Sequence, residues 1–347
     1  MRSTLAARVA AAAAICLSLT GIGAAGPATA CACGGVALPV NAAATASVDH
    51  EVALLHWDGR LETIVMQLAL RTGTEDAALI VPTPAPAQVS AGSAGTFAEL
   101  DELTAPEVVT ERRWFASSGE GATAGAPGAP TVVDQVRLGP LEATTLTGGE
   151  LDGIRNWLRD NGYALRPEVI ATLEPYLREG WSFVALRLTG AAPLTGPLDP
   201  IRLSFAADRL VYPMRMSSAA GTAQYVRLYV LGEHRVVRAD PDAAGQVVSV
   251  AFAGRIFGAR DPDLARLSAN GHDYLTELSV AIRTPSAITS DFTFTAAPAD
   301  TAFREQVRRR EDVLLFGSPA GPQLVVGALL LVVALVLAVP LVRRVRR

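Results

Sequence analysis

Apolar runs in the first part of the chain, and apolar positions with a period of two from residue 181 on, predict β-strands. Residues 48–57 and 60–70 are rich in Val, Leu and Ile and are joined by Asp58-Gly59. An Asp-Gly pair between apolar runs is typical of a type I′ hairpin, in which Trp57 would face Arg60 and Val52 would face Val65. Further strands are predicted at 77–81, 181–188, 201–205, 210–214, 224–231, 247–252, 274–282 and 291–295, with a short helix at 97–103.

A helical period appears in the middle of the chain. Residues 151–158 place apolar side chains at helical spacing, and Thr147 and Glu150 before them predict a capping box. Pro167 suits the first turn of a second helix, which Gly180 ends. Strands followed by two helices and more strands predict an α+β domain with mainly antiparallel sheets and a central helix pair.

The first 30 residues have the layout of a secretory signal peptide. Two arginines precede an apolar run at 9–19, and the segment closes with the small triplet Ala28-Thr29-Ala30. Cleavage is predicted between Ala30 and Cys31. Lipidation of Cys31 is the alternative, although Ala28 stands where a lipoprotein signal has a larger aliphatic residue.

Residues 323–342 are uncharged and almost entirely Leu, Val and Ala. About 20 such residues at about 1.5 Å each cross a hydrocarbon core of about 30 Å. Four arginines follow within 343–347, which predicts a cytoplasmic tail and an N-terminal domain outside the cell membrane. The chain is therefore predicted to consist of a signal peptide (1–30), an α+β domain (31–300), a juxtamembrane stalk (301–322), a transmembrane helix (323–342) and a basic tail (343–347).

Residues 116–130 are mostly Gly, Ala, Ser and Pro. This composition predicts a flexible loop, at which the domain would divide if it has two lobes.

Charge excludes some classes of function. All 34 acidic residues lie between Asp49 and Asp312, but six of the 30 basic residues belong to the two terminal segments, so the domain itself is acidic. An acidic domain has no electrostatic reason to bind nucleic acid. Every basic residue is arginine, which excludes Schiff-base chemistry and a P-loop lysine.

Cys31 and Cys33 are the cysteines that remain after cleavage. A disulfide between them would close a small, strained ring, while two free thiolates are ligands for a soft metal or a redox pair. They are too few for a zinc site. We expect them to begin the domain as a simple tether, so no metal site and no cofactor is predicted, and Cys31 and Cys33 stay the candidates for either.

The histidines do not form a predicted site. His50 and His56 would share one strand face about 20 Å apart, too far for a common metal ion. His234 and His272 lie in turn-like sequences. No catalytic motif is present and no catalytic residue is predicted.

Other chemistry-bearing residues are open to more than one interpretation. The carboxylates of Asp199, Asp208, Glu233 and Asp240 could pair for acid–base work, but spacing does not show which of them meet. The tryptophans are expected to be core residues, namely Trp57, Trp114, Trp157 and Trp181.

Several motifs together resemble the bacterial domain-of-unknown-function 2330 (DUF2330) family. They are Cys33-Gly34-Gly35 after the export signal, Ile80-Val81-Pro82-Thr83-Pro84, residues 158–163, residues 181–188, and residues 201–205 leading to Val211-Tyr212-Pro213. The resemblance covers most of the predicted domain and implies its extent and its export. It implies no activity.

Three hypotheses follow. The first is a non-enzymatic envelope protein that is anchored in the cell membrane and binds an envelope protein or another envelope component. The second is an envelope hydrolase with paired carboxylates. The third is a thiol- or metal-handling protein that acts through Cys31 and Cys33.

Overall fold

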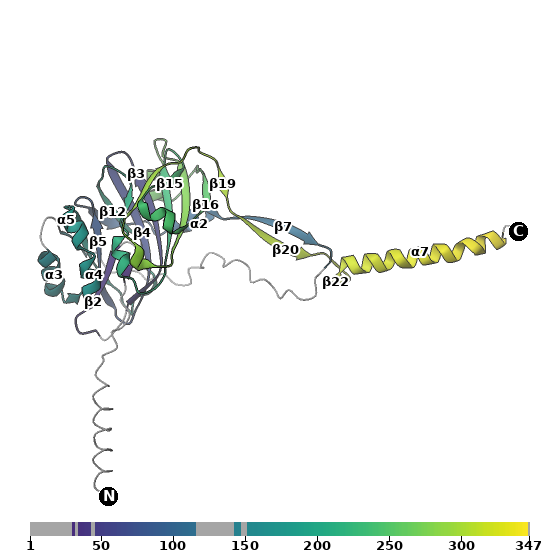
Figure 1. Cartoon of the computed structure of the whole chain (residues 1–347), viewed down its shortest axis with the longest axis horizontal. Helices are drawn as coiled ribbons and strands as arrows, with labels where there is room; N and C mark the ends of the chain where they lie inside the picture. Colours follow the sequence, from purple (N-terminus) through teal and green to yellow (C-terminus); the bar gives the residue numbers. More distant parts are fainter. Residues whose placement is uncertain (1–29, 32–33, 43–45, 116–141, 147–150, 346–347) are drawn as a thin grey trace, which may run out of the picture.

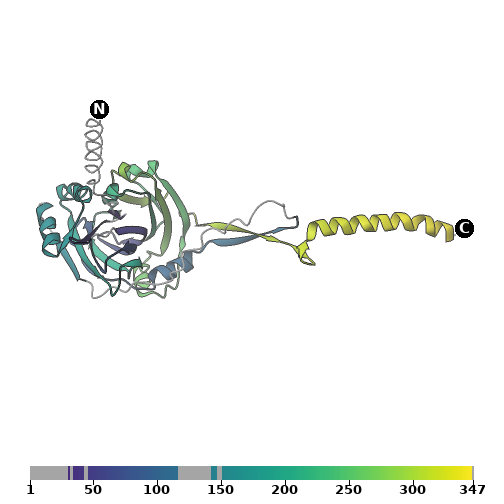
Figure 2. The same ribbon diagram turned by 90° about the horizontal axis from the view of Figure 1, so that it is seen from below.

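The structure, a computed structural model, describes residues 30–31, 34–42, 46–115, 142–146 and 151–345. The predicted signal peptide up to Thr29, Cys33, the loop at 116–130 and the capping box of Thr147 and Glu150 lie outside these residues. Figure 1 shows a head that contains the large sheets, a two-stranded ribbon that leaves it, and one long helix beyond the ribbon. Figure 2 shows the strands of the head curving around a shared interior.

Among the described residues, the larger sheet has nine strands in the spatial order β19-β16-β17-β14-β3-β4-β12-β6, with β11 paired to β4. All neighbours are antiparallel except β14 and β3. In chain order the strands are β3 (Ala46–Trp57), β4 (Leu61–Thr72), β6 (Gln88–Ala91), β11 (Thr195–Pro197), β12 (Ile201–Ala206), β14 (Gln224–Gly232), β16 (Val247–Arg255), β17 (Tyr274–Ile282) and β19 (Phe303–Arg304).

A second sheet has six described strands in the order β1-β2-β5-β10-β8, with β9 paired to β2. They are β1 (Ala30–Cys31), β2 (Gly34–Pro39), β5 (Asp76–Thr83), β8 (Glu142–Leu146), β9 (Tyr163–Ala164) and β10 (Ser182–Thr189). A smaller sheet joins β13 (Val211–Tyr212), β18 (Phe292–Ala296) and β15 (Val236–Arg238). The predicted α+β class with mainly antiparallel sheets is confirmed.

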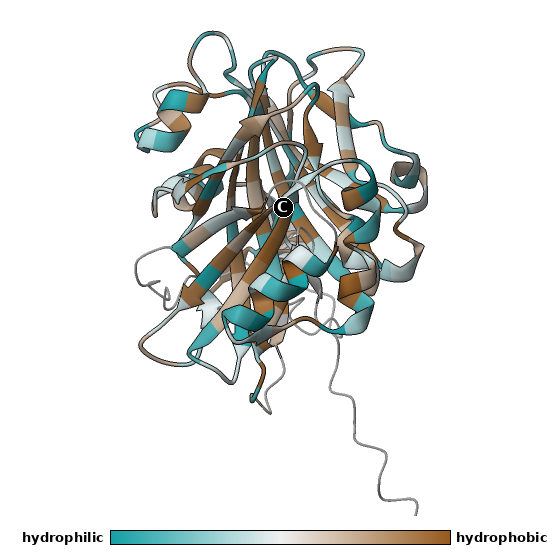
Figure 3. Ribbon diagram, turned by 90° about the vertical axis from the view of Figure 1, so that its left-hand side faces the viewer, coloured by the Kyte–Doolittle hydropathy of each residue, from teal (hydrophilic) through white to brown (hydrophobic). Residues whose placement is uncertain are grey.

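The main apolar core lies between the two large sheets. Leu55, Ile64 and Leu228 from the larger sheet are in one buried cluster with Leu79 and Leu186 from the second sheet. In Figure 3 apolar positions predominate on the strands that cross the middle of the head, and hydrophilic ones are frequent on its outer helices. Burial of this interior is the main stabilising contribution to the head.

Helices cover the outer face of each sheet. On the second sheet, Leu158 of α3 (Leu151–Asp160) is buried in a cluster with Phe183 of β10. On the larger sheet, Leu100 of α2 (Thr96–Thr104) and Leu264 of α6 (Pro262–Leu267) are buried with Leu54 of β3. α6 matters most for the site described below, because it carries two of the charged residues there.

The second predicted helix forms as two short ones, α4 (Pro167–Ala171) and α5 (Glu174–Arg178). Pro175 lies in the first turn of α5 and has no backbone N–H. The hydrogen-bond ladder of α4 therefore cannot continue through it. The apolar stripe survives the break, since Val169 and Tyr176 are both buried in the same cluster.

The hairpin at Asp58-Gly59 is confirmed, but its predicted register is wrong. Trp57 pairs with Glu62 rather than Arg60, and Val52 pairs with Gln67 rather than Val65. The Asp58 carboxylate accepts hydrogen bonds from the amides of Arg60 and Leu61 at 2.9 and 2.7 Å, and the amide of Asp58 donates to the Leu61 carbonyl. The turn is therefore centred on Gly59 and Arg60, one residue further along the chain than predicted.

The glycine pair after Cys33 has a packing role. A Cβ at Gly34 would lie 2.4 Å from the carbonyl oxygen of Ile80, and one at Gly35 would lie 2.8 Å from a Val169 methyl. Gly34 therefore lets β2 approach β5, and Gly35 leaves room for the helices above the second sheet. Packing alone therefore explains the two glycines of the Cys33-Gly34-Gly35 motif.

The ribbon consists of β7 (Glu107–Arg113) and β20 (Gln306–Asp312), which are parallel. A tight hairpin of β21 (Leu314–Leu315) and β22 (Ser318–Pro319) follows, and then α7 (Ala320–Val345) (Figure 1). The predicted transmembrane segment falls within α7. In the part of the chain that the structure describes, no helix is both long and apolar enough to cross a membrane.

Candidate functional site

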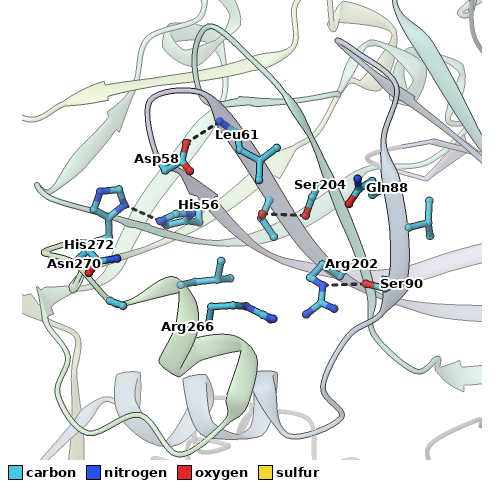
Figure 4. Close-up of a pocket in the computed structure, with 14 residues that line it drawn as sticks. His56, Asp58, Leu61, Gln88, Ser90, Arg202, Ser204, Arg266, Asn270 and His272 are labelled. Atoms are coloured by element: carbon cyan, nitrogen blue, oxygen red, sulfur yellow. Dashed lines mark hydrogen bonds between the residues drawn. The ribbon is translucent and has the colours of Figure 1, made fainter.

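A cavity of about 740 Å³ opens beside the turn between β3 and β4. Strands β3, β4, β6 and β12 form one side, and α6 with the turn after it forms the other (Figure 4). Most of the side chains that line it are polar. The residues used below are His56, Asp58, Thr63, Gln88, Ser90, Arg202, Ser204, Arg266, Asn270 and His272.

Two histidines meet at one end of the cavity. Nε2 of His56 lies 2.7 Å from Nδ1 of His272, and the ring centroids are 4.8 Å apart. At this distance one ring N–H donates to the lone pair of the other nitrogen, which requires at least one ring to be neutral. Nε2 of His272 also lies 3.7 Å from an oxygen of Glu233.

His56 is neutral near pH 7. Burial disfavours its charged form and His272 repels a second positive charge, so its pKa falls to about 4 despite the attraction of Asp58. The cavity therefore presents an uncharged imidazole that is held in place by its partner. Such a group donates or accepts hydrogen bonds but adds no charge.

Asp58 provides the carboxylate of the lining. The backbone amide of Leu61 is the main cause of its lowered pKa, and the amide of Arg60 acts in the same direction. The carboxylate is therefore ionised, and the amides of Arg60 and Leu61 hold it in place in the turn. A general acid needs the opposite shift, because it must keep its proton near neutral pH.

Two arginines lie at the other end of the cavity and share one buried carboxylate. The guanidiniums of Arg202 and Arg266 both donate to Oδ1 of Asp263, whose side chain is only 4% exposed. The second oxygen of Asp263 accepts the amide of Ser93 at 2.8 Å. Two guanidiniums therefore share one carboxylate at this end of the cavity.

The arginines differ in how freely they can meet a ligand. Nε of Arg202 donates to Ser90 Oγ at 3.0 Å, and its side chain is 23% exposed. The Arg266 side chain is 57% exposed. Arg202 is therefore held in the wall of the cavity. Arg266 lies at the rim and keeps N–H groups that can donate to a ligand.

Hydroxyl and amide side chains fill the space between the two ends. Thr63 and Ser204 are paired across β4 and β12, and their hydroxyls lie 3.1 Å apart. Gln88 and Asn270 also line the cavity (Figure 4). Each of these groups both donates and accepts, so together they match a ligand with several hydroxyls.

The sequence predictions about histidine and tryptophan need correction. His272 is not simply a turn residue, since the fold brings it to His56, 216 positions away. Trp57, Trp157 and Trp181 pack against the core clusters as predicted, whereas Trp114 is 49% exposed. No sequence signal could have joined two histidines so far apart.

A second cavity of about 640 Å³ brings Asp208 and Asp240 together with Glu179 and Asp291. Arg215 binds both Glu179 and Asp291, and the side chain of Asp240 is held by Arg238 in a pair that is 1% exposed. These ion pairs are structural. Asp199 and Glu233 lie elsewhere, and Asp199 lines neither cavity.

The predictions about thiols stay predictions. Cys31 is the second residue of β1, and Cys33 lies outside the described residues. Among the residues that are described, no group of three His, Cys, Asp or Glu side chains could hold a metal ion. Cleavage after Ala30 is likewise untested.

Comparisons with known proteins give a family but no activity. A family model described as "Uncharacterized protein conserved in bacteria (DUF2330)" matches residues 27–295. No curated protein matches the chain.

Two similar solved structures are of baculovirus P35. One has 7% identity and a TM-score of 0.37, and covers 74% of this chain and 99% of its own. The other, a mutated P35 after caspase cleavage, has 9% identity and a TM-score of 0.31, and covers 71% and 99%. These scores are too low to support an argument.

Proposed function

The chain belongs to the DUF2330 family of uncharacterised bacterial proteins, and from that premise we propose that it is a membrane-anchored binding protein of the cell envelope. Its head would bind a small polyhydroxylated ligand with one acidic group, such as an acidic sugar. The head would lie outside the cell, and α7 would hold it to the membrane. The family name adds no activity, so the proposal depends on the cavity.

The charge arrangement of the cavity carries the proposal. Arg202 and Arg266 share the single carboxylate of Asp263, which leaves one guanidinium able to bind an acidic group. The neutral His56 and the hydroxyls of Thr63 and Ser204 offer hydrogen bonds to the rest of the ligand. A volume of about 740 Å³ is within the usual range for a small-molecule site.

The hydrolase hypothesis has less support. Asp58 is the one carboxylate that lines this cavity among the described residues, and its lowered pKa keeps it ionised. In the second cavity, Glu179, Asp240 and Asp291 are engaged by arginines. Glycoside hydrolysis uses two carboxyl groups, and the described lining of the first cavity has one.

Membrane anchoring is supported by α7 and by the arginines that follow it. Side chains of α7 such as Leu324, Leu330 and Leu335 are 52–65% exposed, so no other part of the described chain covers them. An uncovered apolar helix is stable in lipid rather than in water. The signal-like first 30 residues support export of the head.

Calorimetric titration tests the binding function. We expect the full chain in detergent to bind glucuronate-containing oligosaccharides and to bind their neutral glucose counterparts more weakly. Arg266→Gln should weaken binding of the acidic sugar about 10-fold, since a charge-assisted hydrogen bond contributes about 1.5–3 kcal/mol. It should leave the neutral sugar unaffected.

Arg260→Gln is the matched control. Arg260 is also exposed and ion-paired, but its partners are Glu99 and Glu102, outside the cavity. Equal losses in the two variants would indicate a general charge effect and would contradict the site. Absence of heat with every acidic and neutral sugar would overturn the proposed ligand class.

A further inference from the structure

The far end of the ribbon joins two segments of the chain to the first turn of α7. Arg113 and Asp312, 199 positions apart, close the ribbon with a salt bridge of 2.7 Å. The amide of Gly321 then donates to the carbonyl of Trp114 at 2.7 Å. A Cβ at Gly321 would lie 2.7 Å from the Phe115 ring, so the residues after β7 pack directly on the helix.

Large apolar side chains are exposed at this junction. We call them the collar: Trp114, Phe115, Leu314, Leu315 and Phe316, which are 49%, 59%, 58%, 38% and 93% exposed. Phe316 and Gly317 form the turn between β21 and β22 at φ values of 52° and 79°. A phenylalanine is unusual in this left-handed conformation, and here the turn presents its ring to the surroundings.

Polarity changes abruptly between the ribbon and the collar. Along the ribbon, charges are paired across the strands, as in Arg308 with Glu111 and Arg113 with Asp312. One residue beyond each strand end the chain becomes apolar, and the apolar surface continues onto α7 at Leu324 and Val325. This change from charged to apolar side chains is confined to one level along the long axis of the molecule. It therefore matches a flat boundary between water and lipid better than it matches the uneven surface of a protein partner.

We propose that the collar inserts into the outer boundary of the bilayer, so that the segment after β7 is a second membrane contact beside α7. This inference rests on the proposed anchoring by α7. Trp and Phe at the end of an apolar helix are typical of the aromatic belt at a membrane interface. Two contacts from distant parts of the chain would hold the ribbon, and with it the head, at a set distance from the membrane.

Fluorescence of Trp114 tests this insertion. The full chain is reconstituted into phosphatidylcholine and phosphatidylglycerol vesicles that contain lipid brominated either near the headgroup or near the chain end. We expect headgroup-proximal bromine to quench part of the emission, and we expect the Trp114→Leu variant to lose that part. The other three tryptophans pack in the head and provide the unquenched background.

Phe316→Ser should reduce the quenching by about half, because it removes the most exposed ring of the collar. Phe257→Ser is the matched control, since Phe257 is 76% exposed on the head. If the chain floats with the vesicles but Trp114 is not quenched, the proposed insertion of the collar is wrong, whereas the proposed anchoring by α7 is supported. If Trp114 is then also shielded from aqueous acrylamide, a protein such as a second copy covers it instead. If the chain does not float, both the proposed anchoring by α7 and the proposed insertion of the collar are wrong.

Discussion

At the residue scale, the cavity is defined by side chains whose charge states are set by their neighbours. Burial and His272 keep His56 uncharged, whereas amides of the turn keep Asp58 ionised. Asp263 is buried but holds two guanidiniums, so its charge is compensated. The local environment, rather than the residue type alone, decides what each group can do.

The lowered pKa of His56 predicts a loss of stability in acid. The unfolded chain takes up a proton near pH 6.5 and the folded chain only near pH 4, so the free energy of unfolding falls as the pH falls through this range. Because His56 is partly exposed, we expect a contribution on the order of 1 kcal/mol. His56→Gln should make the curve of unfolding free energy against pH shallower, as measured by urea denaturation between pH 7 and pH 4.

His50 provides the control for this measurement. Burial and Arg227 lower its pKa as well, so the single variant should keep a residual slope. The double variant of His50 and His56 should have a shallower slope than either single variant. Identical slopes in the wild type and His56→Gln would show that this imidazole is not the group that resists protonation.

At the scale of elements, α6 holds the cationic end of the cavity in place. Asp261 caps the helix by accepting the amides of Asp263 and Leu264, each at 3.0 Å. Its carboxylate also accepts hydrogen bonds from the hydroxyls of Ser93 and Thr96. One side chain therefore joins α6 to the loop that precedes α2, and it places Asp263 and Arg266.

Loss of this cap should affect both stability and binding. Asp261→Ala removes four hydrogen bonds, and we expect the free energy of unfolding to fall by about 2 kcal/mol or more, since a simple cap contributes about 1 kcal/mol. Affinity for the acidic sugar should also fall, because Arg266 follows the helix. Denaturant unfolding and calorimetry measure the two effects.

Asp242→Ala is a comparison for Asp261→Ala. Asp242 also accepts several hydrogen bonds, from Thr289 and Ser290, but away from the cavity. It should lose stability and keep its affinity. If Asp261→Ala binds as tightly as the wild type, α6 does not depend on its cap for the position of Arg266.

At the scale of the whole molecule, the ribbon and α7 set the head apart. The ribbon pairs β7 with β20 over seven residues each, although the strands are 199 positions apart. The head has its own core between the sheets, and its clusters contain no described residue of the ribbon or of α7. The shape in Figure 1 is therefore that of a folded head carried by an apolar helix.

Removal of α7 should release the protein from membranes without unfolding the head. A chain that stops after Pro319 is expected in the soluble fraction, and the full chain in the membrane fraction after alkaline carbonate washing. The thermal unfolding midpoint of the head should agree between the two within a few degrees, since no described residue of α7 belongs to the core clusters of the head. A full chain that carbonate extracts as readily as the truncated one would argue against a spanning helix.

Local patterns in the sequence determined much of this protein. Long strands such as β10, β14 and β17, the α3 helix, the hairpin at Asp58-Gly59 and the α+β class follow from periodicity and turn chemistry, which depend on near neighbours. Only the tertiary structure decided the hairpin register, the break between α4 and α5, the meeting of His56 with His272, and the pairing of β7 with β20. The reason is physical: these features depend on contacts between distant residues, and many arrangements satisfy the same local pattern until the whole core is packed.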